Sequence, residues 1–98
     1  MKQSDEGLFN SIFPEVVSGQ LFQSTTYFPV VDSARENTSL FPGFVGDIPA
    51  YDYFVFLELD DILHSHRPIL VLKVLTRGGD IGCIHVYSDR NTDIRIVK

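Results

Sequence analysis

The chain has 98 residues, of which 44% are hydrophobic and 21% are charged, and its formal net charge at pH 7 is −5. This composition is close to that of folded globular proteins and excludes wholesale disorder, and the length suits a single domain covering residues 1–98. The single cysteine, Cys83, excludes an internal disulfide and favours a reducing compartment. No apolar run is long enough for a signal peptide or a membrane span, so we expect a soluble, cytoplasmic protein.

The negative charge is concentrated in the first two thirds of the chain. Residues 1–66 contain ten acidic and two basic residues, whereas residues 67–98 contain three acidic and six basic residues. Between Glu36 and His66 there is no lysine or arginine at all. An acidic field disfavours nucleic acid and anionic membranes as partners and favours a basic protein.

The first half of the chain predicts helices, one strand and a loop. Residues 4–13 combine a serine suited to the N-cap with an apolar stripe at helical spacing, which predicts a short amphipathic helix that ends at Pro14. Residues 20–31 are rich in aromatic and β-branched types that alternate, which predicts a strand. Residues 32–37 could form one or two further helical turns. Residues 39–49 contain two prolines and two glycines, so we expect a loop, although an unusually apolar one.

Residues 51–59 alternate cleanly and predict a strand. One face of this strand would carry Tyr51, Tyr53, Val55, Leu57 and Leu59. The other face would carry Asp52, Phe54, Phe56 and Glu58. The alternation alone leaves open which of the two faces is buried.

Three more strands are predicted after this one. Residues 69–76 form an almost continuous apolar run, as in a central strand, and residues 81–87 return from a hairpin turn at residues 77–80, where paired glycines supply positive φ angles. Residues 94–98 would form a last short strand. Short connections favour antiparallel pairing. We therefore expect an α+β fold: a four-stranded C-terminal antiparallel meander plus one N-terminal strand, with one or two short N-terminal helices.

Two sets of residues raise the question of chemistry. The side chains suited to a metal are Asp60, Asp61, His64, His66, Cys83 and His85, but they follow no recognised ligand spacing. The side chains suited to phosphodiester cleavage are Glu58, Arg67, Arg77, His85 and Tyr87. Their register is open, and an acidic chain does not attract a polyanion. We therefore expect no catalytic residues, no metal site and no cofactor.

The remaining feature is the segment from Asp47 to Asp61, which holds five carboxylates, two tyrosines and two phenylalanines but no base. Such a segment is either a solvated face over a buried core or a surface for a basic partner. The residues that we predict to bind a partner are Asp47, Tyr51, Asp52, Tyr53, Glu58, Asp60 and Asp61. The loop aromatics Phe41 and Phe44 are alternative anchors.

These observations favour a small acidic inhibitor, an immunity protein or antitoxin that occludes the active site of a basic toxin, most readily a nuclease. The chain is similar to such proteins in size and charge only. We expect a basic protein partner, no direct contact with nucleic acid or membrane, and a monomer or weak homodimer. Two alternatives remain open: a small nuclease or metal-dependent hydrolase that uses His64, His66 or His85, and an adaptor that associates through an exposed sheet edge.

Overall fold

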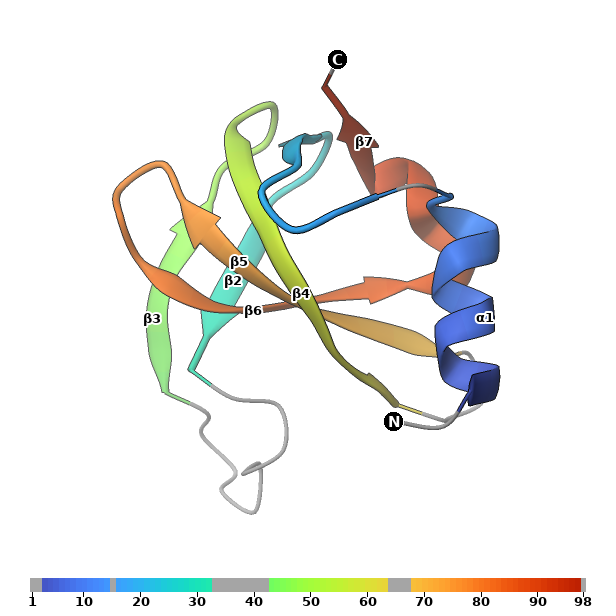
Figure 1. The fold of residues 1–98 in the computed structure, drawn as a ribbon. Helices are drawn as coiled ribbons and strands as arrows, with labels where there is room; N and C mark the ends of the chain where they lie inside the picture. The colour runs from blue at the N-terminus through green and yellow to red at the C-terminus, as the bar shows by residue number, and fades with distance from the viewer. Residues whose placement is uncertain (1–2, 15, 33–42, 64–67, 98) are drawn as a thin grey trace.

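A computed structural model of the chain describes residues 3–14, 16–32, 43–63 and 68–97 (Figure 1). Seven strands form one antiparallel sheet in the order β3-β2-β6-β5-β4-β1-β7, with a single α-helix in the described ranges. The elements are α1 (Gln3–Ile12), β1 (Leu21–Ser24), β2 (Phe28–Val31), β3 (Phe44–Ile48), β4 (Tyr53–Leu63), β5 (Ile69–Thr76), β6 (Ile81–Tyr87), the 3₁₀ segment η1 (Ser88–Asp93) and β7 (Ile94–Ile96).

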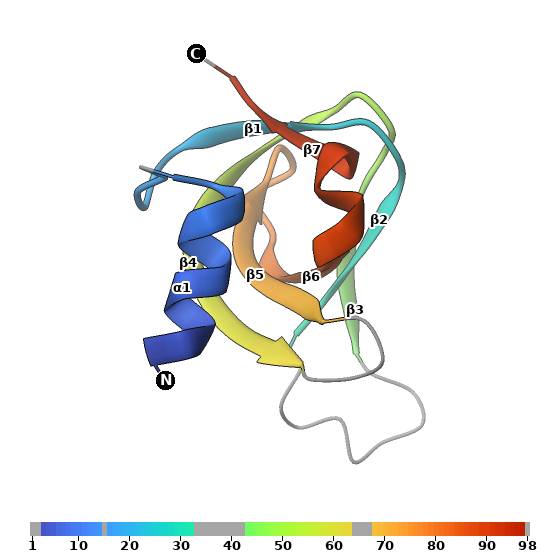
Figure 2. The same cartoon turned by 90° about the vertical axis from the view of Figure 1, so that its right-hand side faces the viewer.

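The sheet curls into a half-barrel, and α1 and η1 both lie on the side toward which it curls (Figure 1, Figure 2). The concave side is filled with aromatic rings. Phe9 of α1 stacks on Phe56 of β4 with ring centroids 5.5 Å apart, and Phe13 meets Phe22 of β1 edge-on at 5.7 Å. Phe22 also stacks on Phe54 at 5.6 Å. These contacts join the helix segment to β4 and β1.

The helix predicted from the apolar stripe is confirmed as α1. It begins at Gln3, one residue before the expected cap, and the chain reaches Pro14 two residues after its end. Its apolar stripe buries Phe9 and Phe13, while Ile12 packs at the margin of the core. Within the described ranges, no helix has the length and apolar character needed to cross a membrane.

The expected four-stranded meander is wrong. β4, β5 and β6 do pair in succession, and β5 and β6 have the predicted bounds, but β7 pairs with β1. The edge of β6 that does not pair with β5 pairs instead with β2, where Val31 lies opposite Cys83. η1 therefore carries the chain to the far edge of the sheet, where the Val97 N–H donates to the Leu21 carbonyl at 2.9 Å. Local spacing could not reveal this, because the competing strand comes from the first third of the chain.

The single N-terminal strand is also wrong, because the segment 20–31 divides at residues 25–27. β1 joins β4 and β7, whereas β2 joins β3 and β6 on the other side of the sheet. The predicted loop 39–49 contains β3, whose pairing with β2 satisfies its backbone despite Gly46. The second helix expected after Asp32 lies at residues 33–37, outside the described residues.

Two glycines have clear structural reasons. Gly79 adopts φ +93° in the turn between β5 and β6, which is closed by the Thr76 N–H donating to the Asp80 carbonyl at 2.8 Å. Gly82 lies where β2 crosses closely over β6, and a Cβ there would come within 2.6 Å of the Val31 carbonyl oxygen. Glycine at this position allows the sheet to curl.

Candidate functional site

Two irregularities in β4 decide which of its residues face outward. The pairing of β4 with β5 shifts register between Phe56 and Glu58 and again between Leu59 and Asp61. Phe54 and Phe56 therefore belong to the core, and Leu59 packs against it, whereas Glu58 lies outside opposite Lys73. The predicted strict alternation is wrong beyond Phe56, because each bulge reverses the faces that follow it.

The structure separates the seven residues predicted to bind a partner. Asp47 lies on β3, Tyr51 and Asp52 lie in the turn before β4, and Tyr53 is the first residue of β4. Glu58, Asp60 and Asp61 follow further along β4. Tyr53 and Asp61 are eight residues apart, which corresponds to about 26 Å along a strand. The acidic segment thus forms two groups, and a single partner must lie along all of β4 to contact both.

The stretch between Glu36 and His66 contains no lysine or arginine, but basic residues from elsewhere in the chain lie beside two of its carboxylates. Arg77 Nη1 lies 3.5 Å from Asp52 Oδ1, and Lys73 Nζ lies 4.0 Å from Glu58 Oε1. Both bases come from the C-terminal third, because β5 pairs with β4 along its whole length. One partner in each pair, Arg77 or Glu58, is mostly exposed, so each pair contributes little to stability, but both pairs neutralise part of the acidic field.

The best-defined feature of this surface is the turn Pro49–Asp52, named here the Tyr51 turn. Tyr51 has φ +66°, and its side chain is 66% exposed. Its N–H donates to the Ser24 carbonyl at 3.0 Å, and its carbonyl accepts a bond from Gln23 Nε2 at 3.1 Å. The buried Ser24 hydroxyl donates to the Pro49 carbonyl at 2.8 Å. The end of β1 therefore holds a bulky residue in a backbone conformation that it disfavours.

A second layer of bonds supports this turn. Arg95 of β7 donates to Gln23 Oε1 through both Nε, at 2.9 Å, and Nη2, at 2.5 Å. The Ser24 N–H donates to the Asp52 carbonyl at 2.9 Å, and the Tyr53 N–H donates to Asp52 Oδ1 at 2.8 Å. The exposed ring of Tyr51 is thus presented on a rigid frame from β1 and β7.

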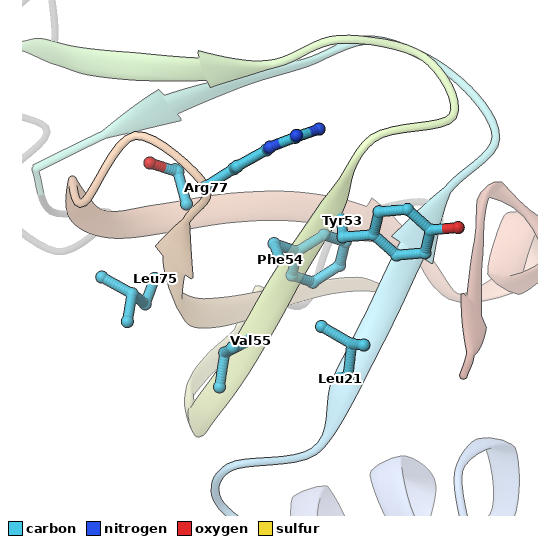
Figure 3. Close-up of a pocket in the computed structure, with 7 residues that line it drawn as sticks. Leu21, Tyr53, Phe54, Val55, Leu75 and Arg77 are labelled. Atoms are coloured by element: carbon cyan, nitrogen blue, oxygen red, sulfur yellow. The ribbon is translucent and has the colours of Figure 1, made fainter. Parts of the chain in front are cut away.

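A shallow depression of about 170 Å³ lies beside this turn on the outer face of the sheet (Figure 3). Leu21, Val55 and Leu75 line it from three neighbouring strands, because Leu21 pairs with Val55 and Val55 pairs with Leu75. Tyr53 and Arg77 also line it. The outer face of the sheet is therefore apolar where it adjoins the Tyr51 turn.

The hairpin turn between β5 and β6 adds Arg77 and Asp80, which the sequence did not predict to bind a partner, although it placed Arg77 among the side chains suited to phosphodiester cleavage. Arg77 reaches Asp52, and the Asp80 carboxylate lies so close to Gly46 of β3 that a Cβ there would come within 2.7 Å of Oδ2. The paired glycines of residues 77–80 predicted the turn that carries Arg77 and Asp80. The sequence could not show which residues lie beside this turn in the folded chain. The hairpin thus joins the Tyr51 turn and β3 into one end of the molecule.

The residues considered for catalysis are placed only in part. Glu58 and His85 share the outer face, but they are two strands apart, which is roughly 10 Å between backbones. Burial lowers the pKa of His85 from its ordinary value of 6.5. His64, His66 and Arg67 lie outside the described residues, and within those residues no three metal-ligating side chains gather. Cys83 is buried beside Val31 and Val71.

Comparison with known proteins adds no relative. No protein-family model, curated protein or solved structure matches the chain. Function must therefore be inferred from the residues and geometry of the chain itself.

Proposed function

We propose that the protein binds a basic protein and inhibits it, as an immunity protein or antitoxin inhibits a nuclease toxin, by covering the active site of its target. The observation that carries this proposal is the Tyr51 turn. A residue with a large, exposed aromatic side chain is held in a strained backbone conformation by hydrogen bonds from Gln23 and Ser24 to the turn. Such strain costs stability, and it is concentrated in proteins at sites of binding and catalysis.

The surroundings of Tyr51 suit protein recognition. Tyrosine gives a large, rigid contact area with few rotatable bonds and is enriched in binding hot spots. The neighbouring depression offers an apolar surface for one side chain of the partner. Asp52 at the rim has a carboxylate that accepts bonds from guanidinium or ammonium groups. Rigid presentation reduces the entropy lost on binding.

The charge of the chain selects the kind of partner. A net charge of −5 attracts a basic protein and accelerates its encounter, which an inhibitor of a harmful enzyme requires. The buried single cysteine fits a reducing, cytoplasmic setting, where an inhibitor of an intracellular nuclease must act. The two partly exposed ion pairs of Asp52 and Glu58 can exchange their bases for those of the partner at small cost.

A capture experiment with matched variants tests the proposal. The wild-type protein, Tyr51→Gly and Tyr87→Ala are each immobilised and exposed to lysate of the source cells, and retained proteins are identified by mass spectrometry. Tyr51→Gly keeps the left-handed backbone without the ring, while Tyr87→Ala removes a ring from the end of β6 remote from the Tyr51 turn. We expect a basic protein that Tyr51→Gly fails to retain and Tyr87→Ala retains.

The captured protein must then be tested for inhibition. Purified partner is assayed for cleavage of RNA and DNA with and without the wild-type chain. Loss of its activity on addition of one equivalent supports the inhibitor role. Retention of the same partner by Tyr51→Gly, or capture of acidic proteins only, contradicts the proposal. Degradation of RNA by the chain alone, abolished in His85→Ala, would instead favour the enzyme alternative.

A further inference from the structure

β3 lies at one edge of the sheet, as Figure 1 shows, and pairs with β2 on one side only among the described residues. A free strand edge exposes a row of backbone N–H and C=O groups that another extended chain can bind. Proteins usually protect such edges with charged side chains, above all lysine, with proline, or by keeping the edge strand short or distorted. β3 has neither lysine nor proline, and its protection consists of its length of five residues, the carboxylate of Asp47 and the register shift opposite Val30 and Val31.

The side chains of β3 are unusually exposed for an apolar strand. Phe44 is 69% exposed and Val45 is 37% exposed, although both belong to a strand whose last residue, Ile48, is fully buried. The buried end fixes the strand in the sheet, and the exposed end offers apolar contact area. β3 also leads directly into the Tyr51 turn, so both features lie on one continuous stretch of chain.

The charges around β3 distinguish between possible occupants. Asp47 is exposed on the strand, the Asp80 carboxylate lies against Gly46, and the Asp32 carboxylate lies against Gly43 at its start. β2 and β3 contain no lysine or arginine. A second copy of this chain would bring two such sets of carboxylates together, which is unfavourable across paired strands. A segment with lysine or arginine at alternate positions is complementary.

We propose that an extended, basic segment of the partner protein pairs with the free edge of β3 and continues the sheet. Backbone hydrogen bonds supply affinity without demanding a particular sequence, and the carboxylates of Asp32, Asp47 and Asp80 select basic side chains. The inference rests on the proposed function, because it names the part of the basic partner that is recognised. It also gives the Tyr51 turn a role. This turn follows β3 directly and would contact the partner segment where the added strand ends.

Two blocked octapeptides serve as probes, one of alternating lysine and valine and one of alternating glutamate and valine. Amide chemical shifts and hydrogen exchange are measured by NMR on the isotopically labelled chain. The lysine peptide should shift and protect amides of residues 44–48, and the glutamate peptide should not. Asp47→Lys should weaken binding of the lysine peptide by about tenfold or more, because it replaces attraction by repulsion on β3 itself.

Asp89→Lys is the matched control. It makes the same change in net charge at an exposed position of η1, beyond the end of β6 that is remote from β3, and should alter binding by less than about twofold, since distant surface charges are screened. Equal binding of both peptides, equal loss in both variants, or shifts that spare residues 44–48 would overturn the inference. Concentration-dependent protection of β3 without peptide, with a dimer in sedimentation, would assign the edge to a second copy instead.

Failure of this inference can be told apart from failure of the proposed function. If Tyr51→Gly abolishes capture of a basic partner while Asp47→Lys retains it, the protein binds as proposed but not through β3. If neither variant changes capture, the binding surface itself is wrong. The two variants therefore test different parts of the surface on the same partner.

Discussion

The two faces of β4 and β5 have opposite characters although the same strands form them. The concave face carries Phe54, Phe56 and Val74, which are buried in a core with the helix. The convex face carries Val55 and Leu75 around a shallow depression, with Glu58 and Lys73 paired beside them. A sheet that faces only water on one side usually alternates apolar and polar residues. The convex face also carries Val71 and Cys83, which are buried with Val31 in a second small core, so apolar residues occur on this face both in that core and around the depression.

The comparison predicts a large difference in stability between the faces. Phe22 is fully buried and contacts three other phenylalanine rings, so Phe22→Ala should lower the free energy of unfolding by about 3–5 kcal/mol. Leu75→Ala on the convex face should lower it by less than about 1 kcal/mol. Urea denaturation of both variants measures the difference. Similar losses in the two would show that the convex face is structural rather than available for a partner.

The Tyr51 turn predicts a variant that gains stability. Glycine adopts positive φ without steric cost, so Tyr51→Gly should raise the free energy of unfolding by about 1 kcal/mol and the midpoint of thermal unfolding by several degrees. Tyr51→Ala keeps the strain, loses the ring and provides the control, which should not gain. Thermal unfolding by circular dichroism distinguishes them. A loss of stability in Tyr51→Gly would mean that the ring packs on its surroundings and is not held for a partner.

His85 predicts a smaller, pH-dependent effect on the convex face. Burial holds its folded-state pKa below 6.5, so the unfolded chain binds more protons between the two pKa values. The stability is therefore complete above pH 6.5 and falls as the pH drops through that value toward the folded pKa. In His85→Gln this decrease should be absent, whereas the titration of the carboxylates remains. Unfolding midpoints of both proteins from pH 7.5 to 5.0 test this, and parallel curves would contradict it.

The smallest effect is expected for the ion pair between Glu58 and Lys73. The Glu58 side chain is mostly exposed, that of Lys73 is partly exposed, and their charged atoms are 4.0 Å apart, so a double-mutant cycle with Glu58→Gln and Lys73→Met should give a coupling energy below about 0.5 kcal/mol. Such a weak pair would leave Glu58 available to a partner. A coupling well above 1 kcal/mol would show that the convex face is organised for its own stability.

Much of the local structure could be predicted, because the signals for it lie within a few residues. The helix over residues 3–12 follows from its apolar stripe, and β5, its glycine turn and β6 follow from hydrophobicity and turn chemistry. The pairing partners of β1, β2 and β7 could not be predicted, because they join segments far apart in the chain. The candidate site was predicted in part: Tyr51 and Asp52 were predicted to bind a partner, whereas Arg77 was named only for phosphodiester cleavage, and Asp80 and the apolar depression were not predicted.

The sequence by itself determined the helix, the central hairpin, the acidic character of the chain and the presence of aromatic residues beside the acids. Only the tertiary structure decided how these residues meet. Bulges in β4 exchanged the faces of Glu58 and Leu59, and pairing with β5 brought Lys73 and Arg77 to a stretch that has no base in sequence. The reason is physical: propensity and alternation act between neighbours in the chain, whereas strand register and charge compensation are set by contacts between distant segments once the core has formed.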